Sequence, residues 1–193
     1  SFDVDGDFQV LLIDIEDASQ YSEIERRRLS LQLQLYFEKI ECPYSFFWYD
    51  GYYVLIVNNL SQKVFYQLVE SMYHRAKNRM RVSALHIGMG TQLKDIRELN
   101  LSYQRALSAV TFARMFQKNI ICFDDMGIYQ ILFSIQDQKI LSDMYHHLLD
   151  ALIQYDQKHN SELEKTLYYY LKYDGSPQKI ARSTYTHRNT VHY

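Results

Sequence analysis

Apolar residues change their spacing several times along the first part of the chain. Short runs of β-branched, aromatic and leucine residues alternate with longer stretches in which apolar residues recur every three or four positions, and these patterns predict strands and helices respectively. The predicted strands cover residues 8–15, two runs within residues 44–57, and residues 82–90 and 120–123. The predicted helices cover about residues 22–40, 61–79 and 96–116. The first part of the chain therefore combines strands and helices.

Two features suggest how these elements are arranged. Asp50-Gly51 stands between two strand-like runs, which predicts a tight hairpin turn. The first six elements follow the order β-α-β-β-α-β, which predicts a sheet with antiparallel strands at its centre and helices on one face, as in ferredoxin-like and nucleotide-cyclase-like domains. In the first helix, Ile24, Leu31 and Leu35, with neighbouring Leu29, Leu33 and Phe37, predict a broad apolar face.

Beyond residue 126 the strand patterns end and the chain is predicted to be helical throughout. One helix is expected at about residues 141–155, and the sequence SELE at residues 161–164 predicts a capping box that opens the next. Gly175 predicts the end of that helix, and Ser176-Pro177 predicts the start of a short one, with a turn at residues 183–185. The sequence thus predicts an α+β domain over residues 1–126 and an all-α domain over residues 127–193, the latter truncated at its C-terminus.

The composition is that of a globular protein in water. Hydrophobic residues make up 47% of the 193 residues, and the formal net charge is -2. No apolar run approaches the roughly 18 residues of a membrane helix, and the acidic start SFDVDGDF lacks the features of a secretory signal. We therefore expect a cytoplasmic protein with no membrane partner. Because the chain starts on Ser1 and its last helical pattern breaks off at Tyr193, we also expect it to be part of a longer protein.

The residues that most often hold metals or cofactors show no recognisable spacing. Cys42 and Cys122 lie far apart in apolar surroundings without a CxxC motif, which favours two reduced thiols over a disulfide or a metal site. The histidines form no HExxH or other metal-ligand pattern. We therefore expect no catalytic residue, no metal and no cofactor.

The C-terminal segment is the one suited to a polyanion. Residues 176–193 contain three basic residues and no acidic one, whereas residues 1–20 contain six acidic residues and no Lys or Arg. Two short helices, the second starting near Thr186, have the proportions of a helix-turn-helix. In that geometry Ile180, Ala181 and Val191 face inward. A generic amphipathic helical hairpin is the alternative interpretation.

The outward residues of the second helix have side chains that suit a DNA major groove. Arg188 can bind guanine O6 and N7, Asn189 can bind adenine N6 and N7, and a helix N-terminus attracts phosphate. The expected DNA-binding residues are Ser176, Gln178, Lys179, His187, Arg188, Asn189, Thr190, His192 and Tyr193. Lys179 is expected to contact a phosphate.

Two stretches carry a resemblance to a known family. ALIQYDQKHNSELEKTLYYYL, followed by IARSTYTHRNTVHY, resembles the C-terminal helix-turn-helix of the PucR/CdaR family of bacterial transcription regulators, and IGMGTQLKDIRELNLSYQRALSAVTFAR resembles the end of the GGDEF-like domain in that family. The resemblance implies a sequence-specific transcriptional regulator that binds double-stranded DNA and controls a catabolic or metabolic operon in response to a signal. A homodimer and a small-molecule effector are further expectations.

An enzymatic function of the first domain is the main competing hypothesis. Diguanylate cyclases share the β-α-β-β-α-β order and hold Mg²⁺ with carboxylates from the first strand and a GG[DE]EF hairpin. Asp14 occupies the first-strand position, but the hairpin reads DGYYV and places Tyr52 and Tyr53 at the acidic positions. A phenol with a pKa of about 10 does not replace a carboxylate ligand at neutral pH, so we expect no enzyme activity. The remaining alternative is a ligand- or partner-binding GGDEF-like module whose helical tail dimerises and does not bind DNA.

Overall fold

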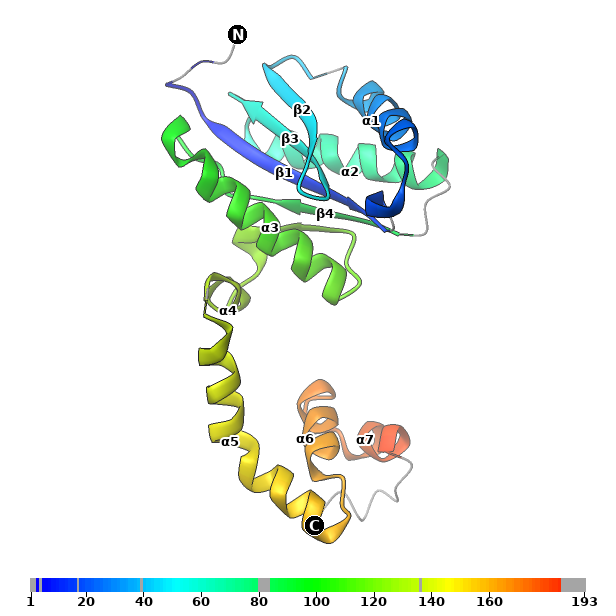
Figure 1. The fold of residues 1–193 in the computed structure, drawn as a ribbon, viewed down its shortest axis with the longest axis vertical. Helices are drawn as coiled ribbons and strands as arrows, with labels where there is room; N and C mark the ends of the chain where they lie inside the picture. The colour runs from blue at the N-terminus through cyan, green and yellow to red at the C-terminus, as the bar shows by residue number, and fades with distance from the viewer. Residues whose placement is uncertain are drawn as a thin grey trace. The chain divides into compact units, whose positions relative to one another are not determined.

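The computed structural model describes residues 3–184 except for residues 4, 17, 39, 80–83 and 136. The chain divides into two compact units, Ser1–Ser134 and Ile135–Tyr193. Figure 1 labels their helices and strands.

The first unit is built on a five-stranded sheet with the strand order β2-β3-β1-β4-β5. The strands are β1 (Phe8–Ile15), β2 (Tyr44–Tyr49), β3 (Tyr52–Asn58), β4 (Leu85–Met89) and β5 (Ile120–Cys122). β1 pairs antiparallel with both β3 and β4, and β2 pairs antiparallel with β3 across the Asp50-Gly51 turn. β5 runs parallel to β4 at the edge. The α+β prediction with antiparallel central strands is confirmed.

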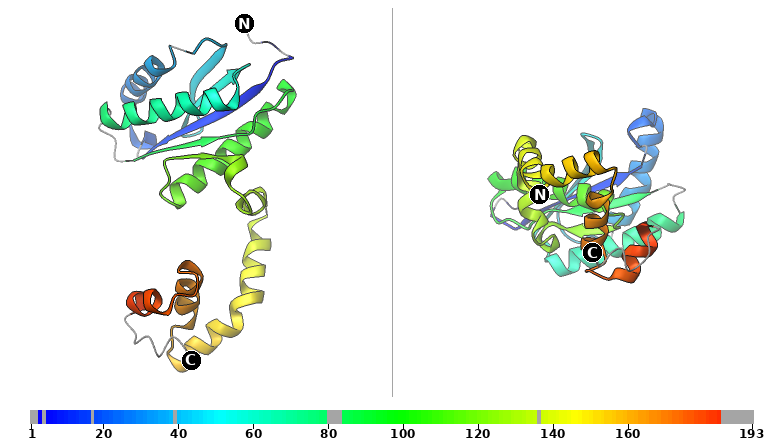
Figure 2. Two further views of the ribbon diagram at one scale, coloured as in Figure 1. Left: turned by 180° about the vertical axis from the view of Figure 1, so that it is seen from behind. Right: turned by 90° about the horizontal axis from the view of Figure 1, so that it is seen from below.

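Helices cover both faces of this sheet. α1 (Glu23–Phe37) and α2 (Gln62–Arg79) lie on one face of the sheet (Figure 2). On this face Leu33 and Phe65 join the larger apolar core. α3 (Leu99–Met115) lies on the opposite face and packs on β1 and β3. The prediction of one helical face holds for α1 and α2, whereas α3 adds a second layer.

The first helix buries a narrower face than the sequence predicts. α1 begins with a capping box, in which the Ser22 hydroxyl accepts from the Glu25 N–H and the Glu25 carboxylate accepts from the Ser22 N–H. Only Leu33 and Phe37 are fully buried along the helix. Three residues predicted to face the core are exposed instead: Ile24, Leu31 and Leu35. The predicted broad face is therefore wrong for these three residues and holds for Leu33 and Phe37, which pack in the core.

Two glycines let α3 lie directly on β4. A Cβ atom at Gly88 would stand 2.3 Å from the Ala106 carbonyl oxygen, and one at Gly90 would stand 2.1 Å from the Ser102 carbonyl oxygen. The buried Ser102 hydroxyl accepts from the Val10 N–H at 3.0 Å and donates to the Thr91 carbonyl at 2.8 Å. The backbone of α3 is therefore in contact with the sheet and is tied to β1.

A short helix, α4 (Tyr129–Ser134), follows β5 and still belongs to the first unit. Its Tyr129 ring lies edge-on to Phe112 of α3, with 4.9 Å between ring centroids, and its Phe133 ring lies 6.1 Å from Phe112. The predicted domain boundary at residue 126 precedes this helix, and the compact units divide after Ser134.

The second unit contains three helices among its described residues: α5 (Gln138–His159), α6 (Leu163–Lys172) and α7 (Pro177–Thr184). The Asp137 side chain caps the start of α5, and Asn160 ends it with a left-handed backbone conformation. The helix is thus longer than the predicted residues 141–155. The helical character predicted for this part of the chain is confirmed.

Candidate functional site

The connection between α6 and α7 positions the start of the predicted helix-turn-helix. Asp174 and Gly175 both have positive φ angles, and the Gly175 N–H donates to the Tyr170 carbonyl at 2.9 Å, which ends α6. Pro177 is the first residue of α7, where its missing N–H leaves no helical bond unmade. The predicted stop at Gly175 and start at Ser176-Pro177 are both confirmed.

α7 has an inner face and a solvent face, as predicted for Ile180 and Ala181; Val191, the third residue predicted to face inward, lies outside the described residues. Ile180 and Ala181 are buried, with exposures of 0% and 8%. The Ser183 hydroxyl donates to the Tyr173 hydroxyl at 3.0 Å, which fastens the end of α7 to the end of α6. The predicted turn at residues 183–185 is wrong for Ser183 and Thr184, because α7 continues through both.

Three of the predicted DNA-binding residues lie at the start of α7. Gln178 and Lys179 are exposed on its first turns, and Ser176 is half-buried just before it. Lys179 forms no ion pair within the part of the chain that the structure describes. The other six predicted residues lie outside the described residues: His187, Arg188, Asn189, Thr190, His192 and Tyr193.

The N-terminus of α6 is capped by a residue of the preceding helix. The Asp156 carboxylate accepts hydrogen bonds from the Leu163 N–H at 2.8 Å, the Glu164 N–H at 2.9 Å and the Ser161 hydroxyl at 2.6 Å. The capping box predicted between Ser161 and Glu164 is therefore wrong, and Glu164 accepts from the Tyr145 hydroxyl instead. These bonds, above all the one from the Glu164 N–H, hold the pKa of Asp156 below its usual range.

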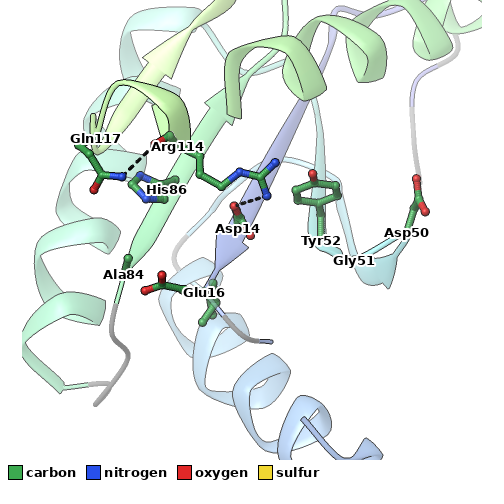
Figure 3. Close-up of a pocket in the computed structure, with 10 residues that line it drawn as sticks. Asp14, Glu16, Asp50, Gly51, Tyr52, Ala84, His86, Arg114 and Gln117 are labelled. Atoms are coloured by element: carbon green, nitrogen blue, oxygen red, sulfur yellow. Dashed lines mark hydrogen bonds and ion pairs between the residues drawn. The ribbon is translucent and has the colours of Figure 1, made fainter. Parts of the chain in front are cut away.

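A polar cleft lies in the first unit, at the end of the sheet where the hairpin turns (Figure 3). The end of β1 supplies Asp14, which forms an ion pair with Arg114 from the last turn of α3 at 3.5 Å. β4 supplies His86, whose Nδ1 lies 2.6 Å from the Lys118 carbonyl. Burial raises the pKa of Asp14, and the Arg114 charge opposes this shift. Sequence reasoning missed Arg114, because no local pattern marks it as the partner of Asp14.

The two tyrosines of the hairpin take different positions. Tyr52 lines the cleft, whereas Tyr53 points into the main core and is fully buried. The Tyr53 hydroxyl donates to the Arg26 carbonyl at 2.9 Å, and burial raises its pKa to about 12. Tyr53 is therefore a structural residue of the sheet, and of the two tyrosines only Tyr52 lines the cleft.

In the described ranges, no three or more His, Cys, Asp and Glu side chains are grouped so that they could hold a metal ion. Among the same residues, no helix is long and apolar enough to span a membrane.

Known families match both units. The model of the GGDEF-like domain matches residues 1–112, and the model of the PucR C-terminal helix-turn-helix domain matches residues 163–193. The second match covers α6, α7 and the residues beyond them. It therefore includes every residue that the sequence predicts to contact DNA.

Two curated relatives come from Bacillus subtilis (strain 168). The DNA-binding transcriptional activator AdeR is 28% identical over 130 residues, which cover 66% of this chain and 31% of that protein. The proline-responsive transcriptional activator PutR is 30% identical over 112 residues, which cover 56% of this chain and 27% of that protein. The match spans less than a third of either relative. A GGDEF-like domain followed by this type of helix-turn-helix places the chain in the PucR/CdaR family of bacterial transcriptional regulators.

Proposed function

We propose that this protein is a sequence-specific DNA-binding transcriptional regulator that controls a catabolic or metabolic operon in the bacterial cytoplasm in response to a small-molecule signal. The observation that carries the proposal is the match of residues 163–193 to the PucR helix-turn-helix, together with an α7 that buries Ile180 and Ala181 and exposes Lys179. The relatives AdeR and PutR are transcriptional activators, which supports the same role here.

In the proposed complex, α7 crosses the DNA backbone and the following residues enter the major groove. Lys179 neutralises a phosphate, and Ser176 and Gln178 approach the backbone at the N-terminal end of α7. Arg188 and Asn189 bind base edges, because the guanidinium matches guanine and the amide matches adenine. The remaining proposed contacts are made by His187, Thr190, His192 and Tyr193.

The GGDEF-like domain acts in this proposal as a regulatory domain and not as a cyclase. Its hairpin has phenols where the similar enzymes have metal-binding carboxylates, and one of the two, Tyr53, is part of the core. The single first-strand carboxylate, Asp14, lies beside the guanidinium of Arg114. A positive charge at this place opposes the binding of Mg²⁺ by Asp14.

DNA binding by variants tests the proposed function. Selection from random duplex DNA defines the operator, and titrations then compare Arg188→Ala, Asn189→Ala and Lys179→Ala with the unchanged protein. We expect each of the first two to lose about 1–3 kcal/mol of binding free energy for the operator, because each removes a base contact. Lys179→Ala should weaken all DNA about equally and reduce the slope of log K against log salt by about one.

Lys139→Ala is the matched control, because it also removes a positive charge from an exposed first turn, that of α5. It should leave the salt slope unchanged. Unchanged operator affinity in Arg188→Ala and Asn189→Ala, with the fold intact, would show that the helical unit does not read DNA in this way. The helical tail would then be assigned to dimerisation.

A further inference from the structure

The cleft of the GGDEF-like domain has the size of a small-molecule site. Its volume is about 320 Å³, and it is bounded by the end of β1, the β2–β3 turn, the start of β4 and the end of α3. Its charged and polar side chains are those of Asp14, Glu16, Asp50, Tyr52, His86, Arg114 and Gln117. Figure 3 shows Arg114 reaching from α3 towards Asp14, with Tyr52 beside them.

Asp14 is a carboxylate with unused hydrogen-bonding capacity. Its side chain is only 13% exposed, and its contact with Arg114 is 3.5 Å long, beyond the usual length of a charge-assisted hydrogen bond. Within the ranges that the structure describes, no side-chain hydrogen bond reaches this carboxylate. A carboxylate can accept several hydrogen bonds, so the partly buried Asp14 is suited to a ligand group that brings N–H donors and positive charge.

Arg114 offers the complementary group. Its side chain is 54% exposed and touches Asp14 through one guanidinium nitrogen. The guanidinium carries five N–H donors in a planar fork, a geometry that suits a carboxylate. An anionic ligand group could therefore bind Arg114 beside Asp14.

The other residues restrict the class of ligand. His86 Nδ1 lies 2.6 Å from the Lys118 carbonyl, which can only accept, so Nδ1 donates to it and Nε2 is the ring nitrogen left for other contacts. Glu16 and Asp50 add two carboxylates to the cleft wall. Three carboxylates against one guanidinium repel a polyanion such as a nucleotide phosphate. A ligand must supply both a cationic donor and one anionic group.

We propose that this cleft binds a small zwitterion with the chemistry of a free α-amino acid, whose ammonium group donates to Asp14 and whose carboxylate accepts from Arg114. The two protein groups lie next to each other, as the two charges do in an α-amino acid. Because Arg114 belongs to the last turn of α3 and Asp14 to β1, the ligand would bridge these two elements. Binding at this site does not depend on DNA.

Calorimetry on the 193-residue protein tests the proposal with the standard amino acids as probes. At least one should bind with a Kd of about 1 mM or tighter. For that amino acid, the deaminated acid and the decarboxylated amine should each bind about tenfold more weakly or worse, because each lacks one charge-assisted contact. Glycylglycine, in which the two charges are far apart, distinguishes free amino acids from peptides and should not bind. GTP with Mg²⁺ should not bind either.

Variants locate the site. Asp14→Asn and Arg114→Met should each weaken binding of the amino acid about tenfold or more. The matched controls are Asp95→Asn and Arg97→Met, which remove the partners of an exposed ion pair elsewhere in the same unit and should leave binding unchanged.

Several results would overturn the proposal. These are no heat from any amino acid, equal binding by the acid or the amine alone, micromolar binding of GTP with Mg²⁺, or full affinity in folded Asp14→Asn and Arg114→Met. The ligand analogues test the unchanged protein, so a variant that fails to fold leaves the test intact. The test contains no DNA, and a negative result would not affect the proposed function.

Discussion

The carboxylate of Asp156 joins two helices through three hydrogen bonds. It belongs to the last turn of α5, yet it accepts from the first N–H groups of α6, which have no partner within their own helix. The negative charge also lies at the positive end of the α6 dipole. One side chain therefore fixes how α6 leaves α5, and α6 in turn carries α7.

Replacing this carboxylate should destabilise the helical unit in a pH-dependent way. We expect Asp156→Asn to lower the melting temperature of this unit at neutral pH, as measured by circular dichroism. The folded pKa of Asp156 is depressed, so its contribution is complete above the unfolded pKa of about 3.9 and is lost as pH falls through the folded value. The difference between the two proteins should therefore shrink below about pH 4.

Asp143→Asn is the control for this experiment, since Asp143 is an exposed acid on the same helix. It should melt like the unchanged protein at both pH values. A difference between Asp156→Asn and the unchanged protein that stays constant down to strongly acidic pH would contradict the assigned role.

The same residue shows where sequence reasoning reaches its limit. The pattern S-x-x-E occurs at residues 22–25 and at residues 161–164. It forms a true capping box only in the first case, because Asp156 reaches the α6 terminus before Ser161 and Glu164 can pair. The S-x-x-E spacing alone cannot show that a carboxylate from the preceding helix binds the same N–H groups.

At the scale of elements, the contact between α3 and β4 leaves no room for a side chain. The missing Cβ atoms of Gly88 and Gly90 allow the helix backbone to touch the strand. Neither glycine has a positive φ angle, so close approach and not backbone conformation explains them. This contact sets the height of α3 above the sheet.

Adding one methyl group at this contact should be costly. We expect Gly88→Ala to lower the free energy of unfolding of the first unit by about 1–3 kcal/mol, because the backbone atoms of Ala106 and Val110 cannot move aside easily. Urea titration followed by tryptophan fluorescence measures this, since Trp48 lies in the same unit.

The control is Gly127→Asn, at a site with open space and a φ angle of 56° that asparagine tolerates. It should change the free energy of unfolding little. A Gly88→Ala protein as stable as the unchanged one would mean that α3 shifts freely on the sheet.

Helices, strands and turns could be predicted where a short sequence motif determines where they begin or end. The hairpin followed from Asp50-Gly51, and α7 followed from Ser176-Pro177. The side of the sheet taken by α3, and the exposure of Leu31 on α1, depend on which surfaces meet in three dimensions. Packing between segments that are distant in the sequence determines both features, so the spacing of apolar residues cannot predict them.

At the scale of the whole molecule, DNA recognition favours a homodimer. A single short recognition helix makes few base contacts, and helix-turn-helix proteins double these contacts through two-fold symmetry. The half-sites of the operator should then lie about 34 Å apart, or a multiple of this. We therefore predict a dimer that binds two half-sites.

Operator spacing measures this directly. Inserting about five base pairs between the half-sites should place them on opposite sides of the duplex and sharply weaken binding, whereas inserting about ten should restore much of it. Sedimentation should show two chains per operator. A strict monomer at tens of micromolar, together with affinity that ignores spacing, would refute the prediction.

The two candidate sites of the molecule differ in how far the sequence predicts them. The proposed DNA contacts lie within one short stretch, so motif and charge pick them out together, and α7 exposes Lys179 as expected. The cleft combines β1, the hairpin, β4 and the end of α3. Asp14 and Arg114 are a hundred positions apart in the sequence and meet only because α3 crosses back over the sheet.

The Asp14–Arg114 pair also sets a threshold for whatever enters the cleft. Arg114 is tethered to the same fold, so its effective concentration at Asp14 is high and independent of the surroundings. Any incoming cation has to compete with it, and each molecule bound gives up part of its binding free energy to that competition. If the cleft binds the proposed zwitterion, this competition weakens the binding, and the site would then fill only at high concentrations of the ligand.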